Sequence, residues 1–114
     1  MNNKTISYSD FEKIDIRLGT IIEAADFNKL NNPSILMKID FGKEIGIKKS
    51  SAQIRKNYNS SDLINKQIIA VVNFPPKQIG NVISEVLVLG LPNEYNEPIL
   101  ISPLERLKNG VKLY

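Results

Sequence analysis

The sequence predicts an all-β fold, in which five strands form a small barrel with one helix between the third and fourth strands and a short helix at the N-terminus. Apolar and polar residues alternate along several segments, as they do along a strand with one buried face. The first such segment is long and Gly19 interrupts it, which fits a strand that bends to serve both halves of a barrel. The 114 residues are enough for one core, so we expect a single domain over residues 1–114.

The expected elements follow in order along the chain. Residues 1–8 should form a flexible N-terminus, and Ser9 should cap a short helix because acidic residues follow it in the first turn. Alternating apolar residues predict five strands, near residues 14–25, 35–41, 43–49, 66–74 and 85–91. Ser50-Ser51-Ala52-Gln53 resembles a capping box, which predicts a helix near residues 50–57. This order is typical of an OB-type barrel. A β-sandwich is the alternative, although it gives no reason for a helix at that point.

Two apolar runs, residues 68–72 and 86–89, do not alternate, so both of their faces should be buried. A barrel interior covers only one face. Burying three or four aliphatic side chains on the other face is worth on the order of 5 kcal/mol, which favours a second subunit. We therefore expect a homodimer in which the C-terminal tail, residues 92–114, reaches the partner. The expected interface residues are Val86, Val88, Ile99, Leu100 and Ile101.

The connection between these runs contains Phe74-Pro75-Pro76, Lys77 and a Gly80-Asn81 turn. The two prolines fix backbone φ angles and would hold Phe74 in place at low entropic cost. In an OB-type barrel this connection lies beside the ligand-binding face. The sequence therefore predicts a binding rim with an aromatic contact and a basic neighbour. The alternative is that Phe74 belongs to the core and the prolines only shape the loop.

The composition argues against an enzyme. The sequence contains no histidine and no cysteine, which removes the commonest general base, the commonest metal ligand and the thiol nucleophile. No spacing pairs another nucleophile with a base, and Arg17 beside Asp15 is most simply a structural charge pair. We expect no cofactor and no metal. No segment has the length and hydropathy of a signal peptide or a membrane span, so we expect a cytoplasmic protein without membrane insertion.

Positive charge is concentrated in the middle of the chain. Residues 43–77 contain seven basic and two acidic residues, a surplus of 5, whereas the rest of the chain carries −2 of the total of +3. Such asymmetry can mark a surface that binds a polyanion. The cations expected to share one face are Lys48, Lys49, Arg55, Lys56 and Lys77. The alternative is that these residues are ordinary solvated cations.

Four segments resemble a known family: DFEKIDIRLGTI (residues 10–21), IDFGKEIGIKKSSAQI (39–54), INKQIIAVVNFPPKQIG (64–80) and SEVLVLG (84–90). They are similar to the CsaA-type export-related chaperones, a branch of the tRNA-binding-domain family of OB folds. The resemblance covers nearly the whole chain from Asp10 to Gly90 and is weaker in the tail. It implies a homodimeric, non-enzymatic OB-fold protein that binds unfolded or pre-export polypeptides. The export machinery and tRNA are further candidate partners.

The sequence departs from the RNA-binding members of that family. Those members carry His-Pro-x-Ala-Asp after the first strand and Ser-x-Gly-Met at the start of the fifth. This chain has Asp-Phe-Asn-Lys-Leu at residues 26–30 and Ser-Glu-Val-Leu at residues 84–87, and Glu85 puts negative charge where phosphates would pass. The departure favours polypeptide binding. The candidate contacts are Phe41, Asn73, Phe74, Lys77, Ser84 and Glu85, although alternation places Phe41 with the inward-facing set.

A tRNA-binding protein of the same family is the alternative function. Its candidate contacts are Lys48, Lys49, Arg55, Lys56, Asn73, Lys77 and Ser84. Phe74 or Tyr58 would stack on bases. Because the two functions share a fold, the fold alone does not decide between them.

Overall fold

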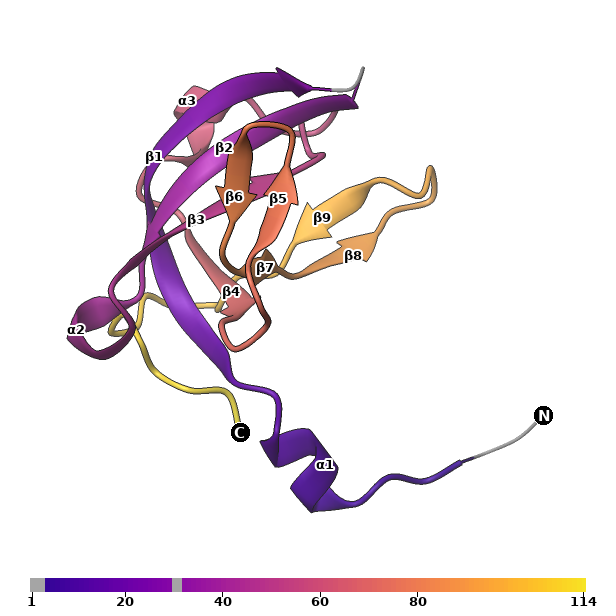
Figure 1. Cartoon of the computed structure of the whole chain (residues 1–114), viewed down its shortest axis with the longest axis vertical. Helices are drawn as coiled ribbons and strands as arrows, with labels where there is room; N and C mark the ends of the chain where they lie inside the picture. Colours follow the sequence, from indigo (N-terminus) through magenta and orange to yellow (C-terminus); the bar gives the residue numbers. More distant parts are fainter. Residues whose placement is uncertain (1–3, 30–31) are drawn as a thin grey trace.

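The computed structural model describes residues 4–29 and 32–114. Its main element is a five-stranded antiparallel sheet in the order β3-β2-β1-β4-β7, which curls into a nearly closed barrel (Figure 1). The strands of this sheet are β1 (Ile16–Lys29), β2 (Asn32–Asp40), β3 (Ile47–Ala52), β4 (Gln67–Val71) and β7 (Leu87–Val88). The prediction of an all-β barrel of five strands is confirmed.

Two hairpins and three short helices complete the described elements. The hairpins are β5 (Lys77–Ile79) with β6 (Val82–Ser84), and β8 (Gly90–Pro92) with β9 (Pro98–Leu100). The helices are α1 (Tyr8–Glu12), α2 (Gly42–Ile45) and α3 (Ser60–Leu63). In Figure 1 the β5–β6 hairpin lies in front of β2 and β3, and α1 extends away from the barrel. Within the described ranges, no helix is long and apolar enough to cross a membrane.

β1 serves both halves of the barrel, as its length predicts. Residues 16–20 pair with β4, and the rest of the strand, from residue 20 onward, pairs with β2. The register with β2 shifts between Ile21 and Glu23. The bulge therefore lies at Ile22 and not at Gly19, and it explains why Ile21 and Ile22 interrupt the alternation.

Gly19 lies where β1 passes closest to the core. A Cβ atom there would lie 2.6 Å from Ile39 Cγ2 and 2.8 Å from ring atoms of Phe41. Both side chains are fully buried, so neither can move aside at low cost. The other large side chains that are fully buried are Ile21, Ile35, Met37, Ile54, Leu63 and Ile68. The inward set that alternation predicts for β2 is thus part of the core.

The prediction of a helix near residues 50–57 is wrong, because β3 continues into this segment and the chain then turns. The cause is long-range hydrogen bonding. The Ser50 hydroxyl donates to the Val86 carbonyl at 3.1 Å, and the Ser51 N–H donates to Ser84 Oγ at 3.1 Å. Serines that resemble a helix cap are therefore bonded to a distant segment. The helix between the third and fourth strands is α3.

Other boundaries differ from the predictions by a few residues. The third strand begins only at Ile47, after α2, and the fifth predicted strand is divided into β7 and β8. The N-cap of α1 is Ser7 and not Ser9. The Ser7 hydroxyl accepts from the Asp10 N–H, and the Asp10 carboxylate accepts from the Ser7 N–H, each at 3.2 Å. Of the N-terminus predicted to be flexible, residues 1–3 lie outside the described ranges.

The C-terminal segment, residues 101–114, packs against its own chain. It pairs with the first part of β1 on the edge opposite β4. The Leu18 N–H donates to the Val111 carbonyl at 3.0 Å, and the Leu113 N–H donates to the Ile16 carbonyl at 2.9 Å. This part of the tail, for which the sequence predicts contact with a partner, covers an apolar surface of its own barrel.

Gln67, at the start of β4, holds the C-terminal segment in place. Its buried side chain accepts from the Leu107 N–H at 3.0 Å and donates to the Leu107 carbonyl at 2.7 Å. Nearby, Asn109 accepts from the Thr20 hydroxyl at 2.6 Å. The segment is therefore fixed by side chains from β4 and β1 as well as by strand pairing.

Arg17 forms the charge pair with Asp15 that the sequence predicts, and it also joins two other segments. Its guanidinium nitrogens lie 2.6 Å from the Asp15 carboxylate, 2.9 Å from Glu44 and 3.0 Å from the Gly110 carbonyl. The hydrogen bond with Asp15 is the main cause that raises the pKa of Arg17 above its ordinary value. Arg17 therefore links β1 to α2 and to the C-terminal segment.

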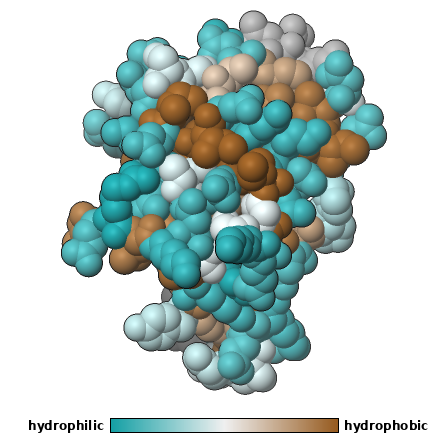
Figure 2. All heavy atoms as spheres, turned by 90° about the vertical axis from the view of Figure 1, so that its left-hand side faces the viewer, coloured by the Kyte–Doolittle hydropathy of each residue, from teal (hydrophilic) through white to brown (hydrophobic). Residues whose placement is uncertain are grey.

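The side of the barrel that carries β1 and α3 has an exposed apolar band (Figure 2). Ile22 on β1 is 38% exposed, and Ile64 directly after α3 is 42% exposed. Ile22 faces outward because it directly follows the inward-facing Ile21 and is the extra, unpaired residue of the bulge.

Replacing Gln67 with alanine should lower the free energy of unfolding by about 1–3 kcal/mol, because the Leu107 backbone groups lose their partners. Urea unfolding followed by circular dichroism measures this change. The control is Gln53→Ala at an exposed position, which should stay within about 0.5 kcal/mol of the wild type. Equal effects of the two substitutions would contradict the anchoring role of Gln67.

Candidate functional site

A pocket of about 350 Å³ lies between β3 and the β5–β6 hairpin, and we call it the hairpin pocket. This volume is at the lower end of the usual range for ligand pockets. Its lining is mainly apolar, from Phe74, Pro75, Ile79, Val86 and Leu87. Its polar members are Ser51, Lys77, Ser84 and Glu85. The structure therefore brings together four of the six predicted polypeptide contacts.

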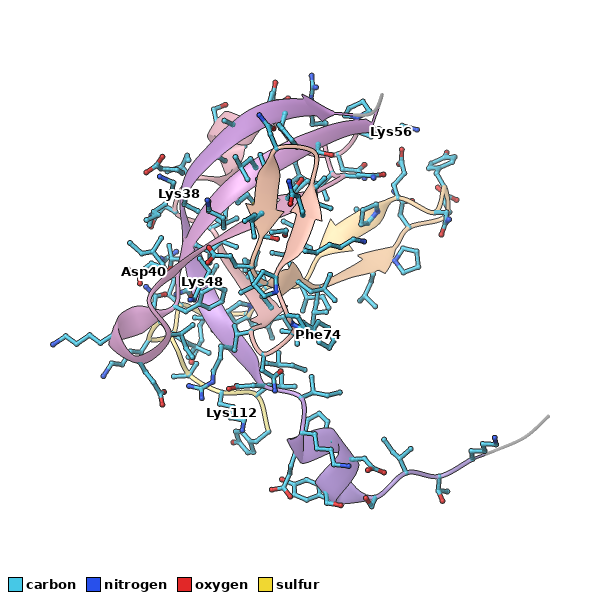
Figure 3. The ribbon with its side chains drawn as sticks, viewed as in Figure 1. Lys38, Asp40, Lys48, Lys56, Phe74 and Lys112 are labelled. Carbon is cyan, nitrogen blue, oxygen red and sulfur yellow. The ribbon has the colours of Figure 1, made fainter. Side chains whose placement is uncertain are left out.

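The rim of the hairpin pocket is built by the segment that follows β4. Phe74 is 49% exposed and lines the pocket, which excludes the alternative that it belongs to the core. Figure 3 shows Phe74 beneath the β5–β6 hairpin. After Pro75 and Pro76, Lys77 begins β5 with an exposed side chain. The chain reverses at Gly80, whose φ of 62° suits a tight hairpin turn.

Ser84 and Glu85 attach the base of the pocket to β3. The Glu85 N–H donates to the Lys49 carbonyl at 2.7 Å, and the Glu85 carboxylate accepts from the Lys49 N–H at 3.0 Å. Ser84 Oγ accepts from the Ser51 N–H at 3.1 Å. Two side chains thus accept hydrogen bonds that backbone carbonyls accept in a regular ladder. Both residues therefore have a structural role at the edge where the barrel closes.

Asn73, a candidate contact in both predicted functions, does not line the hairpin pocket. Its side-chain oxygen accepts from the Asp15 N–H at 2.9 Å, and its amide nitrogen donates to the Lys13 carbonyl at 2.8 Å. Both ends of the amide are therefore bonded to the backbone that leads into β1. Asn73 fixes the end of β4, directly before Phe74, and positions the rim.

Two further candidates lie inside the barrel. Phe41, a predicted polypeptide contact, is fully buried because the inward alternation of β2 continues to it. Val86, a predicted interface residue, is 5% exposed and belongs to the core at the floor of the pocket. Phe41 is therefore corrected from a contact to a core residue, and Val86 belongs to the floor of the pocket rather than to an outer interface.

Several residues of the hairpin pocket were not among the contacts that the sequence predicts. Ile79 belongs to β5, and a Gly-Asn pair between Ile79 and Val82 is a hairpin signal that identifies this strand pair. Ser51 gave no such signal, because its place depends on the length of β3. Leu87, which is 49% exposed, lies in an apolar run that predicted burial on both faces.

The site combines an apolar lining with a few polar side chains. In residues 4–29 and 32–114, no group of three or more acidic side chains is placed to hold a metal ion. The lining combines apolar side chains with one lysine and one glutamate. This arrangement suits apolar capture with charges at its margin.

The barrel and its hairpin match one family of proteins. A family model described as "Putative tRNA binding domain" matches residues 16–112. The chain belongs to the tRNA-binding-domain family. Its five-stranded, nearly closed barrel is the OB fold of that family.

Two solved structures are similar to this member of the tRNA-binding-domain family along nearly its whole length. The chaperone CsaA from Bacillus anthracis str. Ames is 47% identical with a TM-score of 0.91, and the match covers 97% of this chain and 100% of that chain. The CsaA chaperone protein from Picrophilus torridus is 53% identical with a TM-score of 0.88, covering 96% and 100%. The chain is therefore a CsaA-like member of the family.

A curated relative of this tRNA-binding domain is a much larger enzyme. The methionine–tRNA ligase of Pyrococcus horikoshii is 33% identical over 108 residues, which make up 95% of this chain and 14% of the ligase. The chain thus spans about one seventh of the length of this relative. The similarity concerns one domain of the ligase and does not extend to the rest of that enzyme.

The cations of the tRNA-binding alternative do not gather at the hairpin pocket. Lys77 lines that pocket, whereas Arg55 and Lys56 line a separate hollow. Arg55 also lies 3.6 Å from the Asp26 carboxylate. Figure 3 shows Lys48 near α2 and Lys56 toward the opposite end of the barrel. The single face predicted for the five cations is therefore not found, which favours the alternative of ordinary solvated cations.

Two more candidate contacts of the tRNA-binding alternative, Lys49 and Tyr58, also lie away from the hairpin pocket lining. Lys49 is exposed on β3 and lies directly opposite Lys38 on β2. Tyr58, a candidate for base stacking, packs against the core, and its hydroxyl accepts from the Leu100 N–H at 3.0 Å. Tyr58 is therefore held by its own chain through both its ring and its hydroxyl.

The remaining interface candidates differ in exposure. Val88 and Leu100 are partly buried and pack against the core of their own chain. Ile99 is 39% exposed and pairs across the β8–β9 hairpin with Leu91, which is 63% exposed. Ile101 lines a groove of about 490 Å³ between β4 and the C-terminal segment, which we call the tail groove. Apolar surface thus remains uncovered on this side of the barrel.

Replacing Glu85 with alanine should lower the free energy of unfolding by about 1–3 kcal/mol, because the Lys49 N–H loses its acceptor. Urea unfolding measures the change. Glu85→Gln keeps a side-chain oxygen and should recover most of the loss. Glu94→Ala, at an exposed position in the β8–β9 turn, is the matched surface control. A Glu85→Ala protein as stable as this control would show that the hydrogen bond does not matter for closing the barrel.

Proposed function

We propose that this protein is a non-enzymatic chaperone that binds unfolded or pre-export polypeptides through the hairpin pocket. The observation that carries the proposal is the pocket itself, an apolar hollow with the half-exposed Phe74 at its rim. An unfolded chain exposes apolar side chains that a folded protein buries, and a surface pocket can cover them. Similarity to two structures named as CsaA chaperones supports the proposal.

The charges at the pocket refine this proposal. Lys77 is exposed at the rim, and Glu85 lines the same pocket with one carboxylate oxygen bonded to β3. Secretory signal segments carry basic residues before their apolar run, and Glu85 would contact such residues. A chaperone that holds precursors before export acts in the cytoplasm beside the export machinery, and we place this protein there.

A titration at two salt concentrations tests the proposed function. Purified protein is titrated with a permanently unfolded polypeptide and, separately, with tRNA. Apolar capture should persist when the salt concentration rises, whereas binding through phosphates should weaken steeply. Salt-resistant binding of the polypeptide supports the chaperone function. Tight, salt-sensitive binding of tRNA without binding of the polypeptide would contradict it.

Transfer RNA binding is the second candidate function, and the match to the tRNA-binding-domain family is the observation that favours it. The separation of Lys77 from Arg55 and Lys56 counts against it, because one backbone would need to reach both hollows. Glu85 at the base of the hairpin pocket adds repulsion for phosphates.

Replacing Phe74 with alanine should weaken binding of the unfolded polypeptide roughly five- to thirtyfold, because about 1–2 kcal/mol of apolar burial is lost. Isothermal titration calorimetry measures the affinity. Tyr95→Ala is the matched control, since Tyr95 is an aromatic residue with 75% exposure that lines a different hollow. If both variants bind like the wild type, the polypeptide does not use the hairpin pocket.

The homodimer is part of the proposal. Leu91 and Ile99 form an exposed apolar pair on one face of the β8–β9 hairpin, and Ile101 in the tail groove follows Ile99 in the chain on the same face. A second copy that joins these surfaces around a two-fold axis would cover both. A stable interface of this kind should bury more than roughly 1,200 Å² in total.

Replacing Ile99 with aspartate should convert the dimer into a folded monomer, because a buried charge at a two-fold contact is repeated in both copies. Light scattering at micromolar concentration gives the mass, and circular dichroism checks the fold. Ile22→Asp is the matched control, since Ile22 has nearly the same exposure, 38% against 39%, on another side of the barrel. A wild-type protein that is monomeric at this concentration would rule out the dimer.

A further inference from the structure

The β5–β6 hairpin is weakly supported by the rest of the barrel. Each of its strands has three residues, and none of the residues 77–84 is buried. Ile83, on the side away from the pocket lining, is 47% exposed. A two-stranded hairpin is at best marginally stable in water without further packing. This hairpin therefore depends on the few contacts at its ends.

Those contacts are concentrated at one end. At the end of β6, Ser84 Oγ accepts from the Ser51 N–H at 3.1 Å, and Glu85 exchanges backbone and side-chain hydrogen bonds with Lys49. Among the backbone hydrogen bonds of the described residues, none joins residues 77–83 to the barrel. The other end is connected through two prolines, which have no N–H to donate. The hairpin can therefore move without breaking any strand ladder of the barrel.

The hairpin also forms a wall of the hairpin pocket. Lys77 and Ile79 line the pocket from β5, whereas Ser51 and Leu87 line it from the barrel. A movement of the hairpin relative to β3 therefore changes the volume and the opening of the pocket. Leu87 and Phe74, each 49% exposed, are the apolar side chains that closure over a ligand would cover.

We propose that the β5–β6 hairpin is a flap that opens by parting Ser84 from Ser51 and closes over a bound apolar polypeptide segment. The inference rests on the proposed function, since it takes the hairpin pocket as the polypeptide site. A movable wall lets one pocket accept side chains of different size, as a chaperone with many clients requires. Opening exposes the Ser51 N–H, which can then donate a hydrogen bond to water or to a backbone carbonyl of the client.

A disulfide across the flap tests this proposal, and the cysteine-free chain makes the experiment specific. In the Ser51→Cys/Ser84→Cys double variant, oxidation should fix β6 to β3, and mass spectrometry follows the reaction. The probe is reduced, carboxymethylated α-lactalbumin, which stays unfolded. We expect the oxidised variant to bind this probe at least tenfold more weakly than the same variant after reduction. Reductant should not change binding by the wild type.

Equal binding by the oxidised and reduced variant would overturn the flap and leave polypeptide binding intact. If the wild type does not bind the probe at all, in contrast, the proposed function itself is overturned. Hydrogen exchange on the wild type tests the flap without any substitution. The amides of residues 77–83 should exchange faster than those of residues 35–39 in β2, and the probe should slow them at least tenfold. Amides of residues 77–83 that are as protected as β2 in the free protein would overturn the flap.

Discussion

The passage of β1 over the buried side chains of Ile39 and Phe41 is the constraint on which the rest of the structure depends. β1 has 14 residues and changes its pairing from β4 to β2 along its length. Gly19 permits this, because any Cβ atom there would overlap the core. The position of Phe41 in turn sets where the chain enters α2 and where β3 begins. β3 then runs beside residues 84–86, and this contact forms the base of the hairpin pocket.

The strands could be predicted because their signal is local. Ile35, Met37 and Ile39 alternate along β2, and all three are fully buried. The helix near residues 50–57 could not be predicted correctly, since a serine hydroxyl can serve a helix terminus or a distant strand equally well. The hydrogen bond between Ser51 and Ser84, which lie 33 positions apart, favours the strand over the helix. The pairing of the C-terminal segment with β1 has the same origin, because residues 110–113 give no strand pattern of their own.

The candidate site could be predicted where the signal is local to one loop. Phe74 and Lys77 follow from the stiff Phe-Pro-Pro segment, and both line the pocket. The family resemblance made Asn73 a candidate ligand contact. Its partners are backbone groups near the N-terminus, and no local pattern could have pointed to them. Glu85 is instructive in another way. Glu85, whose negative charge is predicted to disfavour phosphates, also accepts a hydrogen bond from the Lys49 N–H on β3, which holds its carboxylate in place. The same carboxylate thus lines the hairpin pocket and helps to close the barrel.

The attachment of the C-terminal segment also determines the order in which this barrel can be completed during synthesis. Leu18 is bonded to Val111, and Gln67 is bonded to Leu107, so β1 and β4 gain these partners only after residues 107–111 have been synthesised. Domains fold during synthesis from the N-terminus onward, and incomplete chains expose apolar surface. Until residues 101–114 emerge, the outer side chain of Ile69 and the free edge of β1 remain open to water. A nascent chain that still lacks residues 101–114 therefore presents an uncovered apolar strand to its surroundings.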